Sequence, residues 1–294
     1  MKASRIIKKI STLIEIKKRR LGRRKLFMQL KRDPDEDIQR LLSTLNFIIK
    51  ENNWTYEEIE DLHKVDKLRN TYLASNEAVR IRDFGAGNLK TTLSGYQMNE
   101  GIDEITTISR VCKGASIPDR WGKLIFKVVR EFKPDNCLEL GTALGISAAY
   151  QIIALKLNNQ GKLITIEGSE ELANIADANL KNLQYPGYSV QSGRFKDVLA
   201  NLLPEYQPVD FAFIDGHHDR IATKEYFEIL YNALANRSIL IFDDINWSKG
   251  MKEVWHEIYL DKRVKLSFDL HRWGICVIDK DNDTAGLRCY KTVI

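Results

Sequence analysis

The sequence is poor in cysteine and lacks the short spacings that mark metal and disulfide sites. Its 294 residues include four cysteines, with no CxxC pair and no histidine-rich segment beside them. They are Cys112, Cys137, Cys276 and Cys289. A zinc site and a disulfide framework are therefore not expected, and the pattern is typical of a protein in a reducing cytoplasm.

Long apolar runs are also missing. No segment reaches the roughly 18 to 20 apolar residues that a membrane-spanning helix needs. The first residues lack both the continuous apolar core and the small-residue cleavage site of a secretory signal. We therefore expect a cytoplasmic protein, with any membrane contact confined to the membrane surface.

Positive charge is concentrated at one end of the chain. Residues 1–32 carry 13 Lys and Arg against the single Glu15, whereas the remaining residues carry 32 basic and 39 acidic side chains. The net charge of +5 thus combines a strongly basic tail with a mildly acidic body. An argument for nucleic-acid binding has to rest on the tail alone.

The tail has the periodicity of a helix. Its apolar residues recur at spacings of three and four, which predicts a basic amphipathic helix interrupted near Gly22. Such a helix could lie on an anionic membrane surface or on RNA. It could equally be a solvated extension or dock on a partner subunit, as in a homodimer. The periodicity does not decide between these uses.

Residues 33–115 are expected to form a helical N-terminal region. Amphipathic patterns predict helices over 35–51 and 55–75, the second opened by a capping box at Thr55–Glu58. The segment RIRDFGAGN (80–88) contains two glycines and predicts a sharply turned loop. Further helices are expected over 102–113 and 119–132.

From residue 116 onward we expect a single α/β domain that extends to residue 294. After Asp135, short β-branched runs alternate with helical patterns, which predicts a parallel sheet covered on both faces. The link between the last two strands, His271–Trp273, is too short for a parallel crossover, so they should form an antiparallel hairpin. The expected strands are 136–140, 163–167, 188–191, 209–214, 238–242, 264–270 and 274–279. The prediction is a seven-stranded Rossmann-like sheet with an antiparallel last strand.

A glycine-containing turn follows the first strand of this domain. The segment ELGTALG (139–145) lies where ligands bind in open α/β sheets. Gly141 would allow close approach of the backbone, and Gly145 would allow tight helix packing. The acidic Glu139 suits a positively charged ligand. A dinucleotide fingerprint is absent, because Ala143 stands where GxGxxG has its second glycine.

The next strand ends in an acid, Glu167. A carboxylate there can accept both hydroxyls of a ribose, which nucleotides and S-adenosylmethionine share. A solvent-exposed loop acid is the alternative. Together with the glycine turn, the acid favours a nucleoside-containing ligand.

With these segments in order, the sequence resembles the class I S-adenosylmethionine-dependent methyltransferases, and specifically the O-methyltransferase group that includes catechol O-methyltransferase. The resemblance covers roughly Trp121 to Lys280. Its segments are ELGTALGIS (139–147), ITIEGS (164–169), VDFAFIDGHH (209–218) and SILIFDDINW (238–247).

The resemblance implies a binding site for S-adenosylmethionine. Five residues would surround the methionine part, namely Glu139, Gly141, Thr142, Gly145 and Ser147. Glu167 would hold the ribose, Gly193 would line the adenine, and Asp215 would contact the cofactor or a metal. Arg194 departs from relatives that have an acid after this glycine, so the adenine amino group needs another acceptor.

The resemblance also implies a metal site. In catechol-type enzymes the matching positions hold Asp, Asp and Asn around Mg²⁺. Here they are Asp215, Asp243 and Asp244, and the third departs from the pattern. Three carboxylates suit a divalent cation that activates a hydroxyl. The alternative is that Asp215 contacts the cofactor while the Asp pair binds substrate or caps the next helix.

Two histidines follow Asp215 on the same loop. An imidazole titrates near neutral pH, so His218 is the expected general base, with Asp244 as its partner in catalysis. A histidine that only orders the loop is the alternative for His217 or His218.

The expected activity is O-methylation of a small-molecule hydroxyl. The rivals are an RNA methyltransferase anchored by residues 1–32, a nicotinamide-dependent dehydrogenase and a non-catalytic S-adenosylmethionine-binding module.

Overall fold

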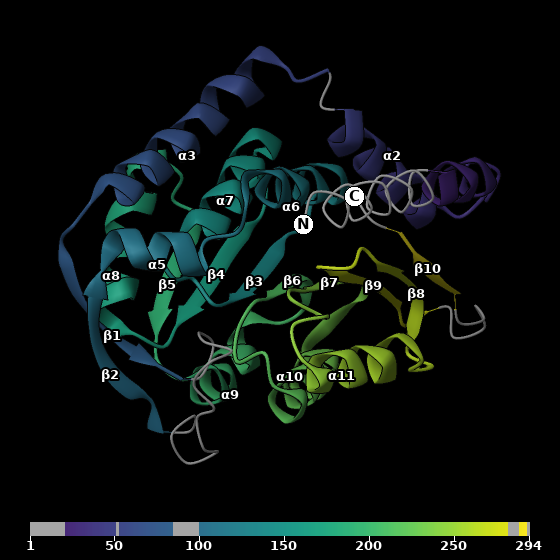
Figure 1. Cartoon of the computed structure of the whole chain (residues 1–294). Coiled ribbons are helices and arrows are strands. Elements are labelled where there is room, and N and C mark those ends of the chain that lie inside the picture. Colours follow the sequence, from purple (N-terminus) through teal and green to yellow (C-terminus); the bar gives the residue numbers. More distant parts are fainter. Residues whose placement is uncertain (1–20, 51–52, 85–99, 282–287, 293–294) are drawn as a thin grey trace, which may run out of the picture.

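Eight strands form the central sheet in a computed structural model that describes residues 21–50, 53–84, 100–281 and 288–292 (Figure 1). Their order across the sheet is β10-β8-β9-β7-β6-β3-β4-β5. In chain order the strands are β3 (Asn136–Leu140), β4 (Lys162–Glu167), β5 (Tyr188–Ser192), β6 (Val209–Ile214), β7 (Leu234–Phe242), β8 (Val264–Asp269), β9 (Gly274–Asp279) and β10 (Arg288–Lys291).

The strand directions match the expected α/β topology. Strands β3 to β7 are parallel, and β9 is antiparallel to both of its neighbours, β7 and β8. The predicted strand count is wrong by one, because β10 pairs in parallel with β8 and adds an eighth strand at the edge. The core strands are short apolar runs, which suits strands buried on both faces.

Helices cover both faces of the sheet (Figure 1). One core layer lies under α6, α7 and α8, and the other under α9, α10 and α11. The bounds are α6 (Asp119–Phe132), α7 (Ile146–Asn158), α8 (Glu170–Leu180), α9 (Phe195–Tyr206), α10 (Arg220–Ala233) and α11 (Lys249–Tyr259). This alternation places every βα turn of the parallel strands at the carboxyl edge of the sheet.

The N-terminal helices pack on the α6–α7 side. They are α2 (Glu36–Lys50) and α3 (Tyr56–Ala74), and the predicted capping box at Thr55 and Glu58 is confirmed. Residues 21–30 are also helical and include Gly22, and Phe27 and Leu30 on this helix are buried in the core. The apolar face of this part of the basic tail is therefore partly covered by the chain itself.

A two-stranded ribbon precedes the α/β domain. β1 (Ala78–Asp83) pairs antiparallel with β2 (Ile102–Thr107), and α5 (Ile108–Ala115) follows. The predicted helix over 102–113 is wrong in its first half, since those residues form β2. The RDFGAG segment is strand as far as Asp83, and its residues 85–88 lie outside the described residues.

Ionic contacts join the start of α2 to the far edge of the sheet. Asp37 is fully buried and accepts hydrogen bonds from Arg237 of β7 and Lys265 of β8. Arg288 of β10 donates to Asp35 at 2.5 Å. The N-terminal region and the C-terminal strand are therefore held on the same side of the sheet.

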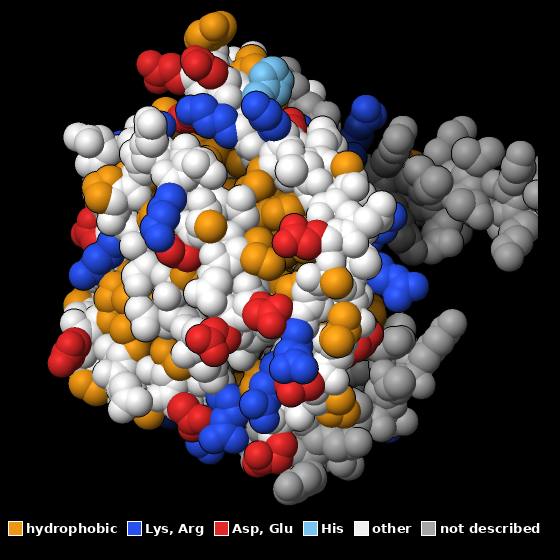
Figure 2. All heavy atoms as spheres, turned by 90° about the vertical axis from the view of Figure 1, so that its left-hand side faces the viewer, with side chains coloured by type: hydrophobic (Ala, Val, Ile, Leu, Met, Phe, Trp, Pro, Cys, Tyr) orange, Lys and Arg blue, Asp and Glu red, His pale blue; other side chains and the backbone are white. Residues whose placement is uncertain are grey.

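The face over β1, β2 and α8 carries acidic and basic side chains interspersed with each other (Figure 2). Such a mixture, among the described residues of this face, does not form the continuous basic surface that a nucleic-acid backbone requires. Within the described part of the chain, none of the helices combines the length and the apolar character needed to cross a membrane.

Candidate functional site

Backbone hydrogen bonds tie together the carboxyl ends of four neighbouring strands. The amide of Gly141 donates to Ile166 O at 2.9 Å, and the amide of Asp215 donates to Leu140 O at 2.9 Å. The amide of Asp243 donates to a carbonyl at the end of β6 at 2.9 Å. The predicted site segments after β3, β4, β6 and β7 therefore lie side by side at one edge of the sheet.

The turn after β3 depends on its first glycine. Gly141 has φ +104°, and a Cβ at this position would lie 1.9 Å from the carbonyl oxygen of Asp215. Gly145 has φ +80°. A Cβ built on it would lie 3.3 Å from the Ala176 side chain of α8, so the missing side chain allows the tight helix packing expected at this position. The two glycines thus allow close contact with the neighbouring strand end and with α8.

Glu139 lies beneath this turn, fully buried. Its Oε2 accepts from Thr165 Oγ1 at 2.5 Å and its Oε1 accepts from Gln151 Nε2 at 2.8 Å. Burial raises the pKa of Glu139 to about 7, although the hydrogen bonds from Thr165, Ser147 and Gln151 oppose the shift. With a pKa near 7, the carboxyl group would lose its proton at neutral pH when a positive charge binds nearby.

Glu167 at the end of β4 supports the same turn. Its Oε2 accepts from the amide of Ala143 at 2.7 Å, and its Oε1 accepts from the amide of Ser169 at 2.9 Å. Burial raises the pKa of this carboxyl group, against the effect of these amides. Each oxygen keeps a further lone pair, so the pair can still accept two hydroxyl groups of a ribose.

The other residues expected at the cofactor lie around this turn. Thr142 Oγ1 is 2.5 Å from Thr165 Oγ1, and Ser147 is buried in the first turn of α7. The amide of Gly193 donates to Glu167 O at 2.9 Å, which fixes the turn after β5 beside the end of β4. The predicted cofactor residues are thus brought together from three consecutive βα units.

Asp215 and His218 form a pair on the loop after β6. His218 Nε2 lies 3.5 Å from Asp215 Oδ1. Burial lowers the pKa of His218, and burial together with the negative charges of Asp243 and Asp244 raises the pKa of Asp215 well above its usual value. The environment thus favours a neutral imidazole, the form that accepts a proton.

Arg272 is a site residue that the sequence patterns did not indicate. Its Nε and Nη2 donate to the two carboxylate oxygens of Asp243 at 2.9 and 2.8 Å, and its Nε lies 3.6 Å from Asp244 Oδ1. Burial and the charge of Asp243 raise the pKa of Asp244 to about 6, and Arg272 opposes this shift. Only the antiparallel pairing of β9 with β7 brings residue 272 to this edge.

This arrangement does not fit the expected magnesium site. Within the described ranges, no group of three or more His, Cys, Asp and Glu is placed so that it could hold a metal ion. Asp243 Oδ1 already accepts from Arg272 and from the amide of Asp244 at 2.5 Å, and its Oδ2 accepts from Arg272, so any cation here would have to share Asp243 with a fixed guanidinium. The expectation that Asp215, Asp243 and Asp244 share a divalent cation is therefore corrected.

Five of the nine described non-glycine residues with positive φ lie at the same edge. Ala143, His217, His218, Asp244 and His271 are non-glycine residues with positive φ, between 40° and 74°. All five lie in loops at the carboxyl ends of β3, β6 and β7 or in the β8–β9 turn beside them. Such conformations cost energy and concentrate at functional sites.

Aromatic side chains complete the loop after β6. Tyr226 Oη lies 2.7 Å from His217 Nδ1, and the Phe195 ring packs edge-on to His217 with centroids 5.6 Å apart. The His218 ring lies 6.1 Å from the ring of Trp247, whose exposed fraction is 39%. Tyr226 therefore fixes His217 in a structural position, which leaves His218 as the histidine of the Asp215 pair.

The β1–β2 ribbon reaches the end of β4, where the ribose is expected to bind. The Phe84 ring lies 2.6 Å from an ideal Cβ built on Gly168, directly after Glu167. The amide of Arg80 donates to Glu171 Oε2 of α8 at 2.8 Å, and the negative charge of Asp83 contributes to the raised pKa of Glu167. Sequence patterns gave no sign of this contact, because it joins a segment about 85 residues upstream.

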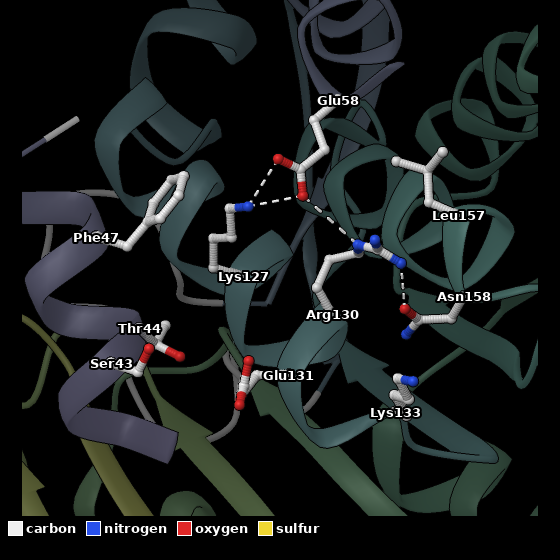
Figure 3. Close-up of a pocket in the computed structure, with 10 residues that line it drawn as sticks. All are labelled: Ser43, Thr44, Phe47, Glu58, Lys127, Arg130, Glu131, Lys133, Leu157 and Asn158. Atoms are coloured by element: carbon white, nitrogen blue, oxygen red, sulfur yellow. Dashed lines mark hydrogen bonds and ion pairs between the residues drawn. The ribbon is translucent and has the colours of Figure 1, made fainter. Parts of the chain in front are cut away.

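A cavity of ≈ 370 Å³ lies away from this edge, where α2 and α3 meet the ends of α6 and α7 (Figure 3). Lys127 Nζ donates to both oxygens of Glu58 at 2.6 and 2.8 Å and lies 3.9 Å from the Phe47 ring. Arg130 points at Glu58 from the same side and donates to Asn158 at 2.5 Å. Three of the ten residues that line the cavity are these paired charges, which bind the N-terminal helices to the domain at the amino ends of the strands.

Comparison with known families supports the assignment of the domain. A family model described as a methyltransferase domain matches residues 138–245. This range contains the turn after β3, Glu167, the Asp215–His218 pair and the Asp243–Asp244 pair. No curated protein sequence matches the chain.

Solved structures resemble the chain in fold. A putative caffeoyl-CoA O-methyltransferase from Staphylococcus aureus matches with a TM-score of 0.50 and 18% identity, over 58% of this chain and 88% of its own. The O-methyltransferase from Bacillus cereus in complex with SAH matches with a TM-score of 0.49 and 25% identity, over 56% and 83%. The O-methyltransferase TomG from Streptomyces achromogenes, in complex with SAM, matches with a TM-score of 0.49 and 21% identity, over 56% and 82%. Residues 138–245 therefore form a methyltransferase domain, and the fold of the chain is similar to that of the Staphylococcus aureus structure.

Proposed function

We propose that this methyltransferase transfers the methyl group of S-adenosylmethionine to a hydroxyl group of a small molecule. The observation that carries the proposal is the Asp215–His218 pair, 3.5 Å apart, at the strand edge where the turn after β3 and Glu167 also lie. S-adenosylmethionine, when bound, supplies a methyl group on a sulfonium that is ready for direct displacement. O-methyltransferases among the solved structures of similar fold agree with a hydroxyl acceptor.

The residues of the chain would divide this work between binding and proton transfer. Glu167 would accept the ribose hydroxyls, and the turn around Gly141 and Thr142 would hold the methionine part beside the buried Glu139. The neutral His218 would take the proton of the acceptor hydroxyl as the oxygen–methyl bond forms and the carbon–sulfur bond breaks. Alignment of acceptor, methyl and sulfur, with exclusion of water, would supply most of the acceleration.

The β1–β2 ribbon of the N-terminal region would determine the acceptor. Phe84 already contacts Gly168 beside Glu167, and the ribbon that carries it is anchored on α8 through Arg80 and Glu171. We therefore propose three parts, with residues 1–32 as a basic tail, 33–115 as an acceptor-selecting region and 116–294 as the methyltransferase domain.

Isothermal titration and a labelled-donor screen test the proposal on the purified full chain. We expect micromolar binding of S-adenosylmethionine and S-adenosylhomocysteine, and no heat with NADH. A panel of small phenols and alcohols with methyl-tritiated donor should then yield a labelled product that His218→Asn reduces about 100-fold. No heat with either sulfur ligand would contradict the cofactor assignment. Labelling of RNA in place of the small molecules would favour the RNA methyltransferase, and donor binding without any turnover would favour the non-catalytic module.

We also propose a binding partner for the basic tail. Residues 1–32 would bind an anionic membrane surface or a second copy of the chain, and residues 1–20 lie outside the described residues. Flotation with phosphatidylserine-containing vesicles measures membrane binding, and sedimentation equilibrium measures self-association, so the two together distinguish the partners. The matched control is the chain without residues 1–20. Equal behaviour of the two chains in both measurements would contradict the proposal.

A further inference from the structure

The turn between β8 and β9 is fixed against the loop that follows β7. The amide of Ile245 donates to Arg272 O at 3.0 Å, and Asn246 Nδ2 donates to His271 O at 2.6 Å. The turn closes on itself through the amide of Leu270 and Trp273 O, 2.8 Å apart. Arg272 therefore projects from a rigid support at the carboxyl edge of the sheet.

The guanidinium of Arg272 binds the two acids that end β7. It makes a two-point contact with Asp243, whose side chain is fully buried, and it approaches Asp244 to 3.6 Å. A planar guanidinium matches a carboxylate in this way and stays charged at any pH of interest. The pair of acids thus already has a cation, supplied by the chain.

A divalent cation would compete directly with this arginine. To bind Asp243 and Asp244 together it would have to share Asp243 with the guanidinium of Arg272, and it would then lie beside that fixed positive charge. The positive field of Arg272 also reaches Asp215, where it opposes the raised pKa of that carboxyl group. All three acids expected to hold a metal are therefore under the influence of one fixed arginine.

We propose that Arg272 takes the place of a divalent cation in this methyltransferase, so that the enzyme binds its acceptor without a metal at Asp243 and Asp244. The inference rests on the proposed function for its catalytic meaning. Arg272 acts as a positioning residue, because it holds Asp243 in place and lies 3.6 Å from Asp244 Oδ1.

The arginine also narrows the class of acceptor. A metal centre favours acceptors that chelate it through two adjacent oxygens, as vicinal diols do. A guanidinium with both of its inward N–H groups occupied by Asp243 offers no such chelation. We therefore infer that the acceptor is recognised through a single hydroxyl group, with proton removal by His218 and without help from a second oxygen.

Binding of Mn²⁺ alone, followed by the loss of the electron paramagnetic resonance signal of the free ion, tests the inference without an acceptor. The wild-type chain, Asp244→Asn and Arg272→Met are titrated in the presence of S-adenosylhomocysteine. We expect wild type to bind no Mn²⁺ at the acids up to 1 mM, so that any binding is the same in Asp244→Asn. Binding by wild type that Asp244→Asn weakens tenfold or more would overturn the inference.

The Arg272→Met variant is expected to gain affinity for Mn²⁺. Removal of the guanidinium leaves Asp243 and Asp244 without their cation, so Arg272→Met is expected to bind Mn²⁺ at least tenfold more tightly than wild type. Arg220→Met, which removes an exposed arginine paired with Glu257, is the matched control and should resemble wild type. A folded Arg272→Met chain with no gain would also overturn the inference. If that variant does not fold, the comparison of wild type with Asp244→Asn still decides.

Failure of this inference can be told apart from failure of the proposed function. If S-adenosylhomocysteine does not bind, the cofactor assignment fails, whereas the Mn²⁺ titration of the free chain still reports on Arg272. Once an acceptor is found, initial rates in EDTA and in Mg²⁺ should agree within twofold. A tenfold loss of rate in EDTA that Mg²⁺ restores would overturn the metal-free mechanism and leave the methyltransferase assignment in place.

Discussion

Gly141 lies directly against the backbone of Asp215, and a Cβ on Gly141 would stand 1.9 Å from the Asp215 carbonyl oxygen. The contact joins the turn after β3 to the end of β6, and it therefore couples the expected methionine-binding turn to the Asp215–His218 pair. No side chain can be accommodated there, because the obstacle is backbone and Gly141 has φ +104°.

The first prediction follows from this contact. Gly141→Ala should lower the free energy of unfolding by about 3 kcal/mol, since it adds backbone strain to a steric overlap. It should also abolish binding of S-adenosylmethionine. Urea unfolding and calorimetry measure the two effects. Gly114→Ala in α5 is the control, because a Cβ there meets no atom within 4 Å and alanine favours the helix. Equal stability of the two variants would show that the strand end can move away.

The second prediction concerns Glu139, whose pKa burial raises to about 7. Between pH 4.5 and 7 the folded state keeps a proton that the unfolded state has released, so this contribution to stability is full below pH 4.5 and is lost as pH rises through about 7. Glu139→Gln imitates the protonated group. The free energy of unfolding of Glu139→Gln, relative to that of wild type, should increase by about 2 kcal/mol from pH 5 to pH 8, as measured by urea unfolding.

Glu131→Gln is the control for this pH dependence, because the Glu131 side chain is exposed. Its stability relative to wild type should be the same at both pH values. A constant difference for Glu139→Gln as well would mean that the buried carboxyl group does not titrate in this range.

Much of the fold was predictable from the sequence. The bounds of β3, β6 and β9 agree with their predicted ranges, because each is a short apolar run between polar turns. The residues predicted to bind the cofactor lie at one edge of the sheet, since the carboxyl ends of parallel strands meet there, and their part in binding stays a prediction. These features are local in sequence, or follow from a single topological rule.

The elements that were missed depend on distant contacts. Ile102, Ile105 and Ile108 recur at a spacing of three, which imitates a helix, yet residues 102–107 form a strand because β1 pairs with them. Strand β10 has four residues and is an edge strand held by pairing with β8 and by Arg288. Arg272 reaches the site only through the antiparallel return of β9, so no spacing in the sequence places it near Asp243.

The third prediction concerns the ionic contacts of α2. Asp37→Asn should destabilise the chain by about 3 kcal/mol, because Asp37 is fully buried and the change removes the carboxylate that pairs with both Lys265 and Arg237. Lys265 keeps Asp35 at 3.2 Å and Asp279 at 3.4 Å as partners. The value is at the lower end of the usual range, since the Arg237 side chain is 45% exposed. Glu225→Gln, which breaks an exposed pair with Lys196, should change stability by about 0.5 kcal/mol or less. Chemical unfolding of both variants at pH 7 decides.

The fourth prediction concerns His218 as the proton acceptor. Burial lowers its pKa below the usual 6.5, so the imidazole stays neutral at neutral pH and is protonated only at lower pH. The ratio kcat/KM should therefore be level above pH 7 and fall by a factor of ten per pH unit below the lowered pKa. His218→Asn should remove this acid limb and reduce kcat about 100-fold while S-adenosylmethionine still binds.

His256→Asn on the exposed side of α11 should leave the pH profile of kcat/KM unchanged. An acid limb that persists in His218→Asn would assign the proton transfer to another group, and the raised pKa of Asp244, about 6, makes that carboxyl group the next to test.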